Sequence, residues 1–289
     1  MEPMEPMEDI LDQISAKYRS FTPRQRAVAE YLFHNPDKAI LLNAAQLAAK
    51  AGVSQATVTR FITVLGFSAF SKFKQALGRK LLADFSTSTR LVKSARALEG
   101  RTSLFTDILR GDIDNIWDLT SRISEDCFEK SVKTLCSAQT LYILGLRSSH
   151  ALAFYLAFNL RFFLRSVQLI DLGVGDIPEK LRDAGPSDVL VVISFKRYTR
   201  EVVKITEKIK KKGTFILGIT NSDLSPIAQL SDMTLITQTK ISTYFESFTA
   251  PMSLLNALIT AIAISERERA LPELENLEQE FQIFETFDH

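Results

Sequence analysis

Two cations follow a run of apolar residues near the middle of the chain, at a place where an anion could be bound. The run Val189–Val192 has the length of a buried strand, and the residues after it turn polar before a helical pattern begins. The polar members of this stretch are Ser194, Lys196, Arg197, Thr199 and Glu201. A strand that leads through hydroxyl groups and cations into a helix offers positive charge and backbone N–H groups to an anion.

A second stretch of this kind lies between the apolar run Thr140–Leu144 and a strongly helical segment that begins near His150. Its polar residues are Arg147, Ser148 and Ser149, and we expect Ser149 to cap the helix. Two hydroxyl-rich loops at helix starts suit a phosphate group on a small polar molecule. Taken singly, each loop is also compatible with helix capping and no ligand.

Five short apolar runs alternate with helical stretches through this part of the chain. The runs are Thr140–Leu144, Val167–Asp171, Val189–Ser194, Phe215–Thr220 and Met233–Thr237. Such an alternation is typical of βαβ units, which form a parallel sheet covered by helices on both faces. We therefore predict an α/β domain with a five-stranded parallel sheet, whose ligand binds beyond the carboxyl ends of the strands.

The N-terminal part of the chain has the pattern of an all-α bundle that contains a helix-turn-helix. Thr22 and the proline after it open one helix, and Asn43 is expected to cap the next, which ends near Gly52. A further helix starts after Ser54, with apolar residues at i, i+3, i+4 and i+7 from Val58. Two short helices joined by a brief turn through glycine form a helix-turn-helix candidate.

The second of these helices has a polar open side that could read DNA bases. Its candidate contact residues are Ser54, Gln55, Thr57, Thr59 and Arg60, and Lys72 and Lys74 further on would suit phosphates. Between positions 15 and 80 the chain has eleven Lys and Arg residues against two acidic residues, a net charge of +9. A small helical dimerisation module with a basic face is the alternative, but a surface that serves only solubility usually mixes both signs.

Composition excludes several other classes. At 289 residues, with 46% hydrophobic and 24% charged residues, the chain is typical of a globular protein of two domains. The acidic start lacks a secretory signal and the apolar segment 251–265 is shorter than a membrane span, which favours the cytosol. Neither GxGxxG nor a Walker loop is present, and the two cysteines and three histidines show no metal spacing. We expect no cofactor and no metal.

The predicted domains are a helix-turn-helix domain at 1–83, connecting helices at 84–125, an α/β effector domain at 126–270 and an acidic tail at 271–289. In the connecting helices we expect Ile116 and Trp117 to lie on a buried face. The last twenty residues contain no Lys or Arg and six acidic residues. This tail could be a helix packed on a partner chain or a solvated end.

The order of these parts resembles the RpiR family of bacterial transcriptional regulators, in which a helix-turn-helix domain precedes a sugar isomerase (SIS) domain. The resemblance covers roughly 10–268 and is carried by VSQATVTRFITVLGFSAFSKFK at 53–74, GLRSS at 145–149 and SFKRYTREV at 194–202. It implies a dimeric or tetrameric regulator of carbohydrate metabolism that binds double-stranded operator DNA and responds to a phosphorylated sugar or sugar acid. Phosphosugar contacts would carry over onto Ser148, Ser149, Ser194 and Thr199.

The chain departs from the family where many SIS domains have Ser-Gly and this one has Lys196 and Arg197. These cations could bind a second acidic group of the ligand, with arginine offering a bidentate fork. Alternatively they are solvated, or their bulk closes the usual pocket. The rival function is a phosphosugar isomerase or lyase, whose base would be Glu201 or His150. A carboxylate at Glu201 is also favourable simply because it stands at a helix start.

Overall fold

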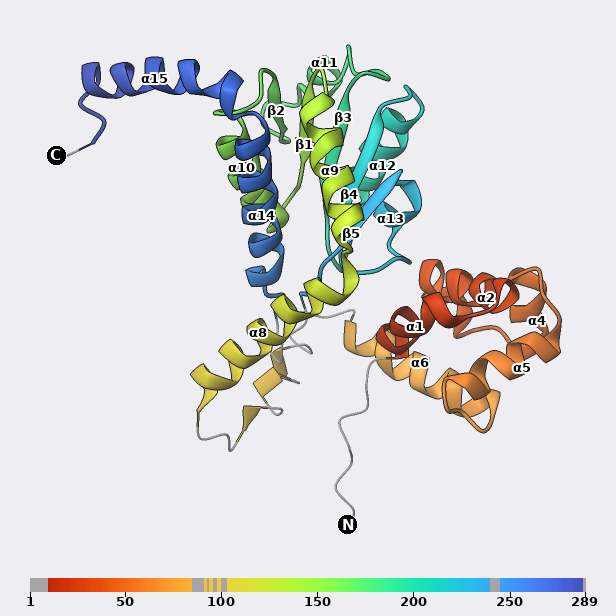
Figure 1. The fold of residues 1–289 in the computed structure, drawn as a ribbon. Helices are drawn as coiled ribbons and strands as arrows, with labels where there is room; N and C mark the ends of the chain where they lie inside the picture. The colour runs from red at the N-terminus through yellow and green to blue at the C-terminus, as the bar shows by residue number, and fades with distance from the viewer. Residues whose placement is uncertain are drawn as a thin grey trace. The chain divides into compact units, whose positions relative to one another are not determined.

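The structure is a computed structural model that describes residues 10–84, 91–92, 94–95, 98–99, 103–239 and 245–287. It divides into two compact units, the first ending at Leu104 and the second beginning at Phe105 (Figure 1). This division falls inside the connecting segment 84–125, part of which lies outside the described residues.

The first unit is built of helices joined by short turns, with no strand among its described residues. Its elements are α1 (Ile10–Lys17), η1 (Tyr18–Ser20), α2 (Pro23–His34), α3 (Pro36–Ala39), α4 (Ala44–Lys50), α5 (Gln55–Val64) and α6 (Phe70–Asp84). Thr22 and Asn43 each form a capping box with the glutamine three residues on, which fixes the starts of α2 and α4 as the sequence predicts.

Helix α5 packs against the rest of the first unit through one face. Phe61 and Ile62 are buried, and the Phe61 ring lies 5.1 Å from that of Phe21 between centroids. At the other end of the helix, Lys17 Nζ donates to the carbonyl oxygen of Val64 at 3.0 Å, where a cation also complements the helix dipole. The opposite face of α5 is thereby left exposed.

The second unit contains the five predicted strands and their helices. Its helices are α8 (Leu104–Arg122), α9 (Glu125–Ser137), α10 (Ser149–Leu160), α11 (Ile177–Lys180), α12 (Arg200–Lys210), α13 (Pro226–Leu230), α14 (Thr249–Ser265) and α15 (Arg267–Ile283). Its strands are β1 (Leu141–Leu144), β2 (Val167–Ile170), β3 (Val189–Ile193), β4 (Phe215–Thr220) and β5 (Met233–Ile236). All neighbouring pairs are parallel, in the order β2-β1-β3-β4-β5.

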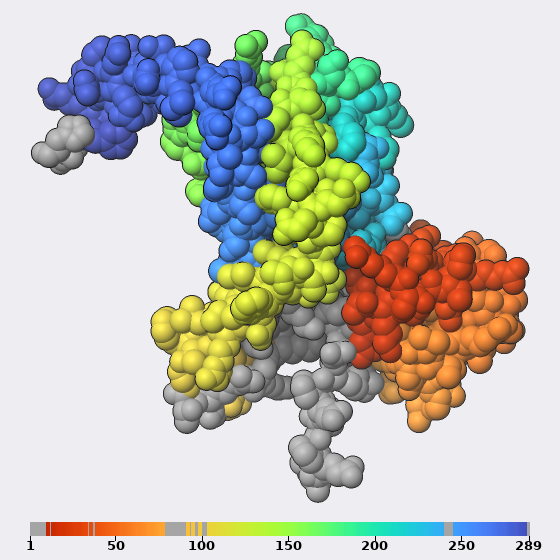
Figure 2. All heavy atoms as spheres, in the orientation of Figure 1, coloured from red at the N-terminus to blue at the C-terminus, as the bar shows by residue number. Residues whose placement is uncertain are grey.

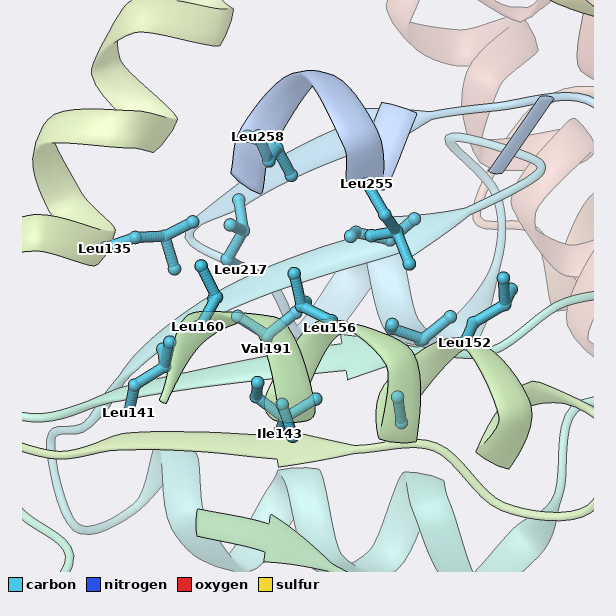
Figure 3. Packing of buried hydrophobic residues seen from close by; sticks show 14 of the residues in the cluster. Leu135, Leu141, Ile143, Leu152, Leu156, Leu160, Val191, Leu217, Leu255 and Leu258 are labelled. Carbon is cyan, nitrogen blue, oxygen red and sulfur yellow. The ribbon is translucent and has the colours of Figure 1, made fainter. Parts of the chain in front are cut away.

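Two hydrophobic layers sandwich this sheet. On one face α9, α10 and α14 pack on β1, β3 and β4, through residues such as Leu135, Leu156 and Leu258 (Figure 3). On the other face α11, α12 and α13 cover the sheet through Leu181, Val202 and Ile227. With both faces covered, the central strands β1 and β3 are buried and apolar along their whole length, which explains their continuous apolar runs, whereas the edge strand β2 exposes Gln168.

The order of the strands places the ends of β1 and β3 side by side. The chain passes from β1 to one edge at β2, then returns to β3 on the other side of β1. Leu144 is in register with Val192, so the loops that follow the two strands start next to each other. A crevice at the carboxyl ends, where the strand order reverses, is the usual ligand site of such sheets.

The connecting helix α8 differs from the sequence prediction. Trp117 is 69% exposed and Ile116 is half-buried, whereas Leu119 and Ile123 pack against the core of the second unit. Only the C-terminal part of α8 contacts that core. The helical spacing of apolar residues earlier in α8 therefore does not mark a face that is buried within this unit. The prediction for Trp117 was wrong.

The acidic tail begins as helix. Most of it lies within α15, which leaves α14 at an angle of 97°. Among the described residues no single helix is long and apolar enough to cross a membrane, although α14 and α15 pass that test jointly despite the bend.

Gly145 is required where β1 ends, because α10 approaches it closely. A Cβ atom there would lie 2.7 Å from the carbonyl oxygen of Ser149 and 2.9 Å from Cβ of Ala153. We expect Gly145→Ala to lower the free energy of unfolding by about 1–3 kcal/mol in chemical denaturation. The control is Gly185→Ala, whose added Cβ would meet only one atom, at 4.0 Å, and which should change stability by about 0.5 kcal/mol or less. Equal effects of both variants would contradict this packing.

Candidate DNA-binding helix and effector site

The turn between α4 and α5 has the geometry of a helix-turn-helix. Gly52 has a φ of +66°, a conformation that glycine adopts freely, and Val53 N donates to the carbonyl oxygen of Ala48 at 2.9 Å. The hydroxyl of Ser54 then caps α5 by accepting from Thr57 N at 3.3 Å. These local interactions fix the direction of α5 relative to α4.

Most of the predicted DNA contacts lie on the exposed side of α5 or on α6. Ser54, Gln55, Thr59, Arg60 and Lys72 are exposed, and Lys74 is half-buried. The hydroxyl of Thr59 donates to the carbonyl oxygen of Gln55 at 3.2 Å, so this side chain lies along its own helix. Gln55 and Arg60 are the longest side chains on this face.

Thr57 differs from the expectation for a base contact. It is only 7% exposed, and its hydroxyl lies 3.0 Å from that of Ser54. Thr57 lies one turn before Phe61 on the same face of the helix. It stands at the edge of the buried face of α5, which is wider than the apolar positions at i, i+3, i+4 and i+7 suggest. Its hydroxyl supports the cap of α5 instead of pointing outward.

The two predicted effector loops meet at the carboxyl ends of β1 and β3, and two of their three serines lie in the interior. Ser149 and Ser194 are buried, and Ser194 N extends the sheet by donating to the carbonyl oxygen of Ile219 at 3.1 Å. The remaining predicted residues lie nearer to solvent. Arg147, Ser148, Arg197 and Glu201 are exposed, whereas Lys196 and Thr199 are half-buried.

The helix starts in these loops leave hydroxyl groups that do not serve as caps. Ser148, and not Ser149 as the sequence suggested, stands at the N-cap of α10, with a helical backbone and no side-chain cap. The chain enters α10 through a tight turn in which His150 N donates to the carbonyl oxygen of Arg147 at 3.1 Å, so Ser149 already belongs to the helix. Thr199 is the N-cap residue of α12, but its side chain does not cap that helix either.

Both loops contain an arginine in the left-handed backbone region. Arg147 has a φ of +56° and Arg197 a φ of +67°. This region costs a non-glycine residue about 1–3 kcal/mol, and such residues cluster at functional sites. Arg197 thus has the backbone that would suit the glycine found at this place in many SIS domains.

Sequence reasoning missed two threonines at the same edge of the sheet. Thr220 ends β4 and Thr237 follows β5, and both hydroxyl oxygens are buried without a hydrogen-bond partner among the described residues. Thr237 N donates to the carbonyl oxygen of Thr220 at 2.9 Å, so the two residues are neighbours. The signal was available, because each threonine directly follows an apolar run, as Ser194 does.

The acidic group nearest the end of β2 is already paired. Lys180 Nζ lies 3.3 Å from Asp171 Oδ1 and 3.1 Å from Asp176 Oδ1. The hydrogen bond with Asp176, with a further one to Asp171, raises the pKa of Lys180 above its ordinary value. This pairing reduces the negative potential that Asp171 would otherwise contribute at the edge where an anion is expected.

The described residues contain no cluster of three or more His, Cys, Asp or Glu side chains that could hold a metal ion. His150, the histidine nearest the loops, has Nδ1 3.2 Å from the carbonyl oxygen of Gly145. Such a contact orients the imidazole ring against the backbone.

Fold and site together define a helix-turn-helix transcription factor with a sugar isomerase type of α/β domain. The model of the helix-turn-helix domain of the rpiR family matches residues 8–84, and that of the SIS domain matches residues 134–261. A transcriptional regulator of the same helix-turn-helix class from Thermotoga maritima is 30% identical over 234 residues, covering 80% of this chain and 82% of the relative. The chain belongs to the rpiR family of transcriptional regulators.

Two further proteins resemble nearly the whole chain. The regulator HexR of Pseudomonas aeruginosa is 25% identical over 282 residues, covering 94% of this chain and 95% of HexR. The structure of the NanR protein of Vibrio vulnificus, solved in complex with ManNAc-6P, superimposes with a TM-score of 0.56 at 18% identity. That superposition covers 95% of this chain and 98% of NanR, and it shows the shared fold.

The left-handed backbone of Arg147 predicts that glycine is favoured there for stability. We expect Arg147→Gly to raise the free energy of unfolding by up to about 1 kcal/mol, since relief of backbone strain outweighs the entropy cost of glycine. The matched control is Arg161→Gly, because Arg161 is also exposed but has an ordinary φ of −60°. That control should destabilise the protein by about 0.5 kcal/mol. Denaturant titrations in which both variants shift in the same direction would contradict the expectation.

Proposed function

We propose that the protein represses or activates transcription by binding double-stranded operator DNA, and that a phosphorylated sugar or sugar acid in the SIS domain controls this binding. One observation carries the proposal: a helix-turn-helix with an exposed polar face and a hydroxyl-rich switch point between β1 and β3 occur on one chain. The ManNAc-6P complex of NanR, a protein of the same fold, supports a phosphosugar as the class of ligand.

The DNA roles follow from chemistry and exposure. Gln55 and Arg60 have the reach and the donor groups for base edges, with Ser54 and Thr59 beside them. Lys72 and Lys74 on α6 suit the phosphate backbone. Thr57 acts through the cap that orients Ser54, since its own hydroxyl lies against that residue.

The effector roles divide between the inner and the outer part of the site. The hydroxyls of Ser148, Ser149, Ser194 and Thr199 would bind the phosphate, together with N–H groups at the start of α12. Arg147, Lys196 and Arg197 would face a second acidic group, where arginine can form two parallel hydrogen bonds with a carboxylate. Glu201, exposed in the first turn of α12, would accept hydrogen bonds from sugar hydroxyls.

Binding without turnover is part of the proposal. Relatives that match 80% and 94% of the chain are named as transcriptional regulators. Glu201 is exposed at a helix start, where a carboxylate is favourable without any catalytic role. A regulator of this kind would act in the cytosol as a homodimer or homotetramer. Loss of a bound phosphosugar through isomerisation, abolished by Glu201→Gln, would overturn this part.

Fluorescence anisotropy on DNA from upstream of the protein's own gene tests the DNA-binding role. We expect specific binding with a log–log salt slope of about −0.9 per phosphate contact. Arg60→Ala should cost about 1–3 kcal/mol on the operator and relax the preference over scrambled DNA. The control is Arg24→Ala, an exposed arginine on α2, which should leave that preference intact. If wild-type protein shows no sequence preference, or if both variants act alike on operator and scrambled DNA, α5 does not read bases.

Calorimetry with a phosphosugar and with its sugar-acid counterpart tests the role of the cations. We expect Lys196→Ser combined with Arg197→Gly to weaken binding of the phosphorylated sugar acid by roughly 10–100-fold, as loss of charged hydrogen bonds implies. The simple phosphosugar should lose much less. Lys208→Ser with Lys211→Gly, two exposed cations at the far end of α12, provides the control of equal charge. Equal losses for both ligands would show that the cations do not select a second acidic group.

A further inference from the structure

The helix α15 has an apolar seam that its own chain buries fully only at the start. From Ala270, apolar residues recur at spacings of four and three as Leu274, Leu277, Phe281 and Phe284, the period of a helix that packs against another helix. Ala270 is buried, but Phe284 is 76% exposed. The seam therefore becomes more exposed toward the C-terminal end.

Acidic residues flank this seam on both sides. Glu278 lies on one side of the heptad pattern, and Glu273 and Glu280 lie on the other. All three side chains are exposed. A partner for this helix should therefore present apolar side chains in the middle and positive charge beside them.

The exposed face of α10 has that chemistry. Phe154 and Phe158 are 54% and 51% exposed, and their rings stack at 6.1 Å between centroids. Phe162 extends the ladder, with its ring 5.5 Å from that of Phe158. Arg161 lies one turn after Phe158 on the same face, and Arg165 follows just beyond the helix, both exposed. Aromatic residues and arginine are the types most enriched in the centre of protein interfaces.

The α15 of the same chain leads away from this face. Arg269 donates from its guanidinium to the carbonyl oxygen of Phe163 and also to Glu266, which fixes the start of α15 beside the end of α10. From there α15 runs at 97° to α14, the helix packed next to α10. Figures 1 and 2 show α15 extending outward beyond the helices that cover the sheet. An α15 held in this direction cannot lie along α10 of its own chain.

We propose that α15 of one protomer packs along the exposed face of α10 in a second copy of the chain, and that the exchange is reciprocal. The apolar seam of α15 lies over Phe154 and Phe158, and its glutamates pair with Arg161 and Arg165. Each protomer offers both surfaces, so a two-fold axis satisfies both contacts at once and closes the assembly as a dimer.

A charge exchange between the two helices tests the pairing. One variant carries Arg161→Glu and Arg165→Glu, and the other carries Glu278→Lys and Glu280→Lys. Each variant alone places like charges across both contacts of its homodimer, and a mixture of the two places opposite charges across both contacts. In sedimentation velocity at low salt, we expect each variant alone to associate at least about tenfold more weakly than wild type, and the mixture to recover most of the loss.

The control variant is Lys208→Glu with Lys211→Glu on α12, which covers the opposite face of the sheet and should associate as wild type does. All exchanged side chains are exposed, so the fold of each protomer should be unchanged. The proposal is overturned if wild type is a monomer, if either variant associates like wild type, if the mixture is no tighter than the variants alone, or if the control weakens equally. DNA binding does not enter the measurement, so this outcome is independent of the proposed function.

Discussion

The close contact between α10 and the end of β1 is the constraint on which the second unit depends. Gly145 has no side chain, and the carbonyl oxygen of Ser149 occupies the space that a Cβ would need. This approach lets Leu152, Leu156 and Leu160 reach the sheet along the whole helix (Figure 3). It also sets the start of α10 directly at the end of β1, beside the end of β3. The same close approach of α10 to β1 therefore stabilises the core and also places the loop serines.

Interactions that are local in sequence could be predicted, and those that depend on tertiary packing could not. The five strands lie within a residue of the expected runs, because strands of a parallel sheet covered by helices are short, nearly continuous apolar segments. The caps at Thr22 and Asn43 depend only on residues three positions away. By contrast, the exposure of Trp117 depends on where α8 leaves the core. The burial of Thr57 depends on the rotation of α5 about its own axis. The left-handed backbone at Arg147 and Arg197 has no signature in residue type, since both positions hold arginine instead of glycine.

The distribution of polar groups at the switch point is consistent with a ligand that has a buried end and an exposed end. Ser149, Ser194 and the hydroxyls of Thr220 and Thr237, which have no hydrogen-bond partner in the described part of the chain, are buried at this edge of the sheet, where hydrogen bonds are strong because water is excluded. The guanidinium groups of Arg147 and Arg197 lie toward solvent, where desolvation costs little. Strained backbone at both arginines is easier to understand if their side chains serve binding, because glycine would be the more stable choice at either position.

Helix α10 belongs both to the proposed effector site and to the proposed contact between two copies of the chain. The first turn of α10 contributes Ser149 to the effector site, and the exposed face of the same helix is the surface proposed for α15 of a second copy. A rigid helix transmits a small displacement along its whole length, so a ligand that shifts the start of α10 also shifts Phe154 and Phe158. The ligand can change assembly only by binding more tightly to one arrangement than to the other, and assembly must then change ligand affinity by the same factor. The spacing of two DNA-binding domains would depend on that arrangement, which gives an effector in the SIS domain a physical route to the operator.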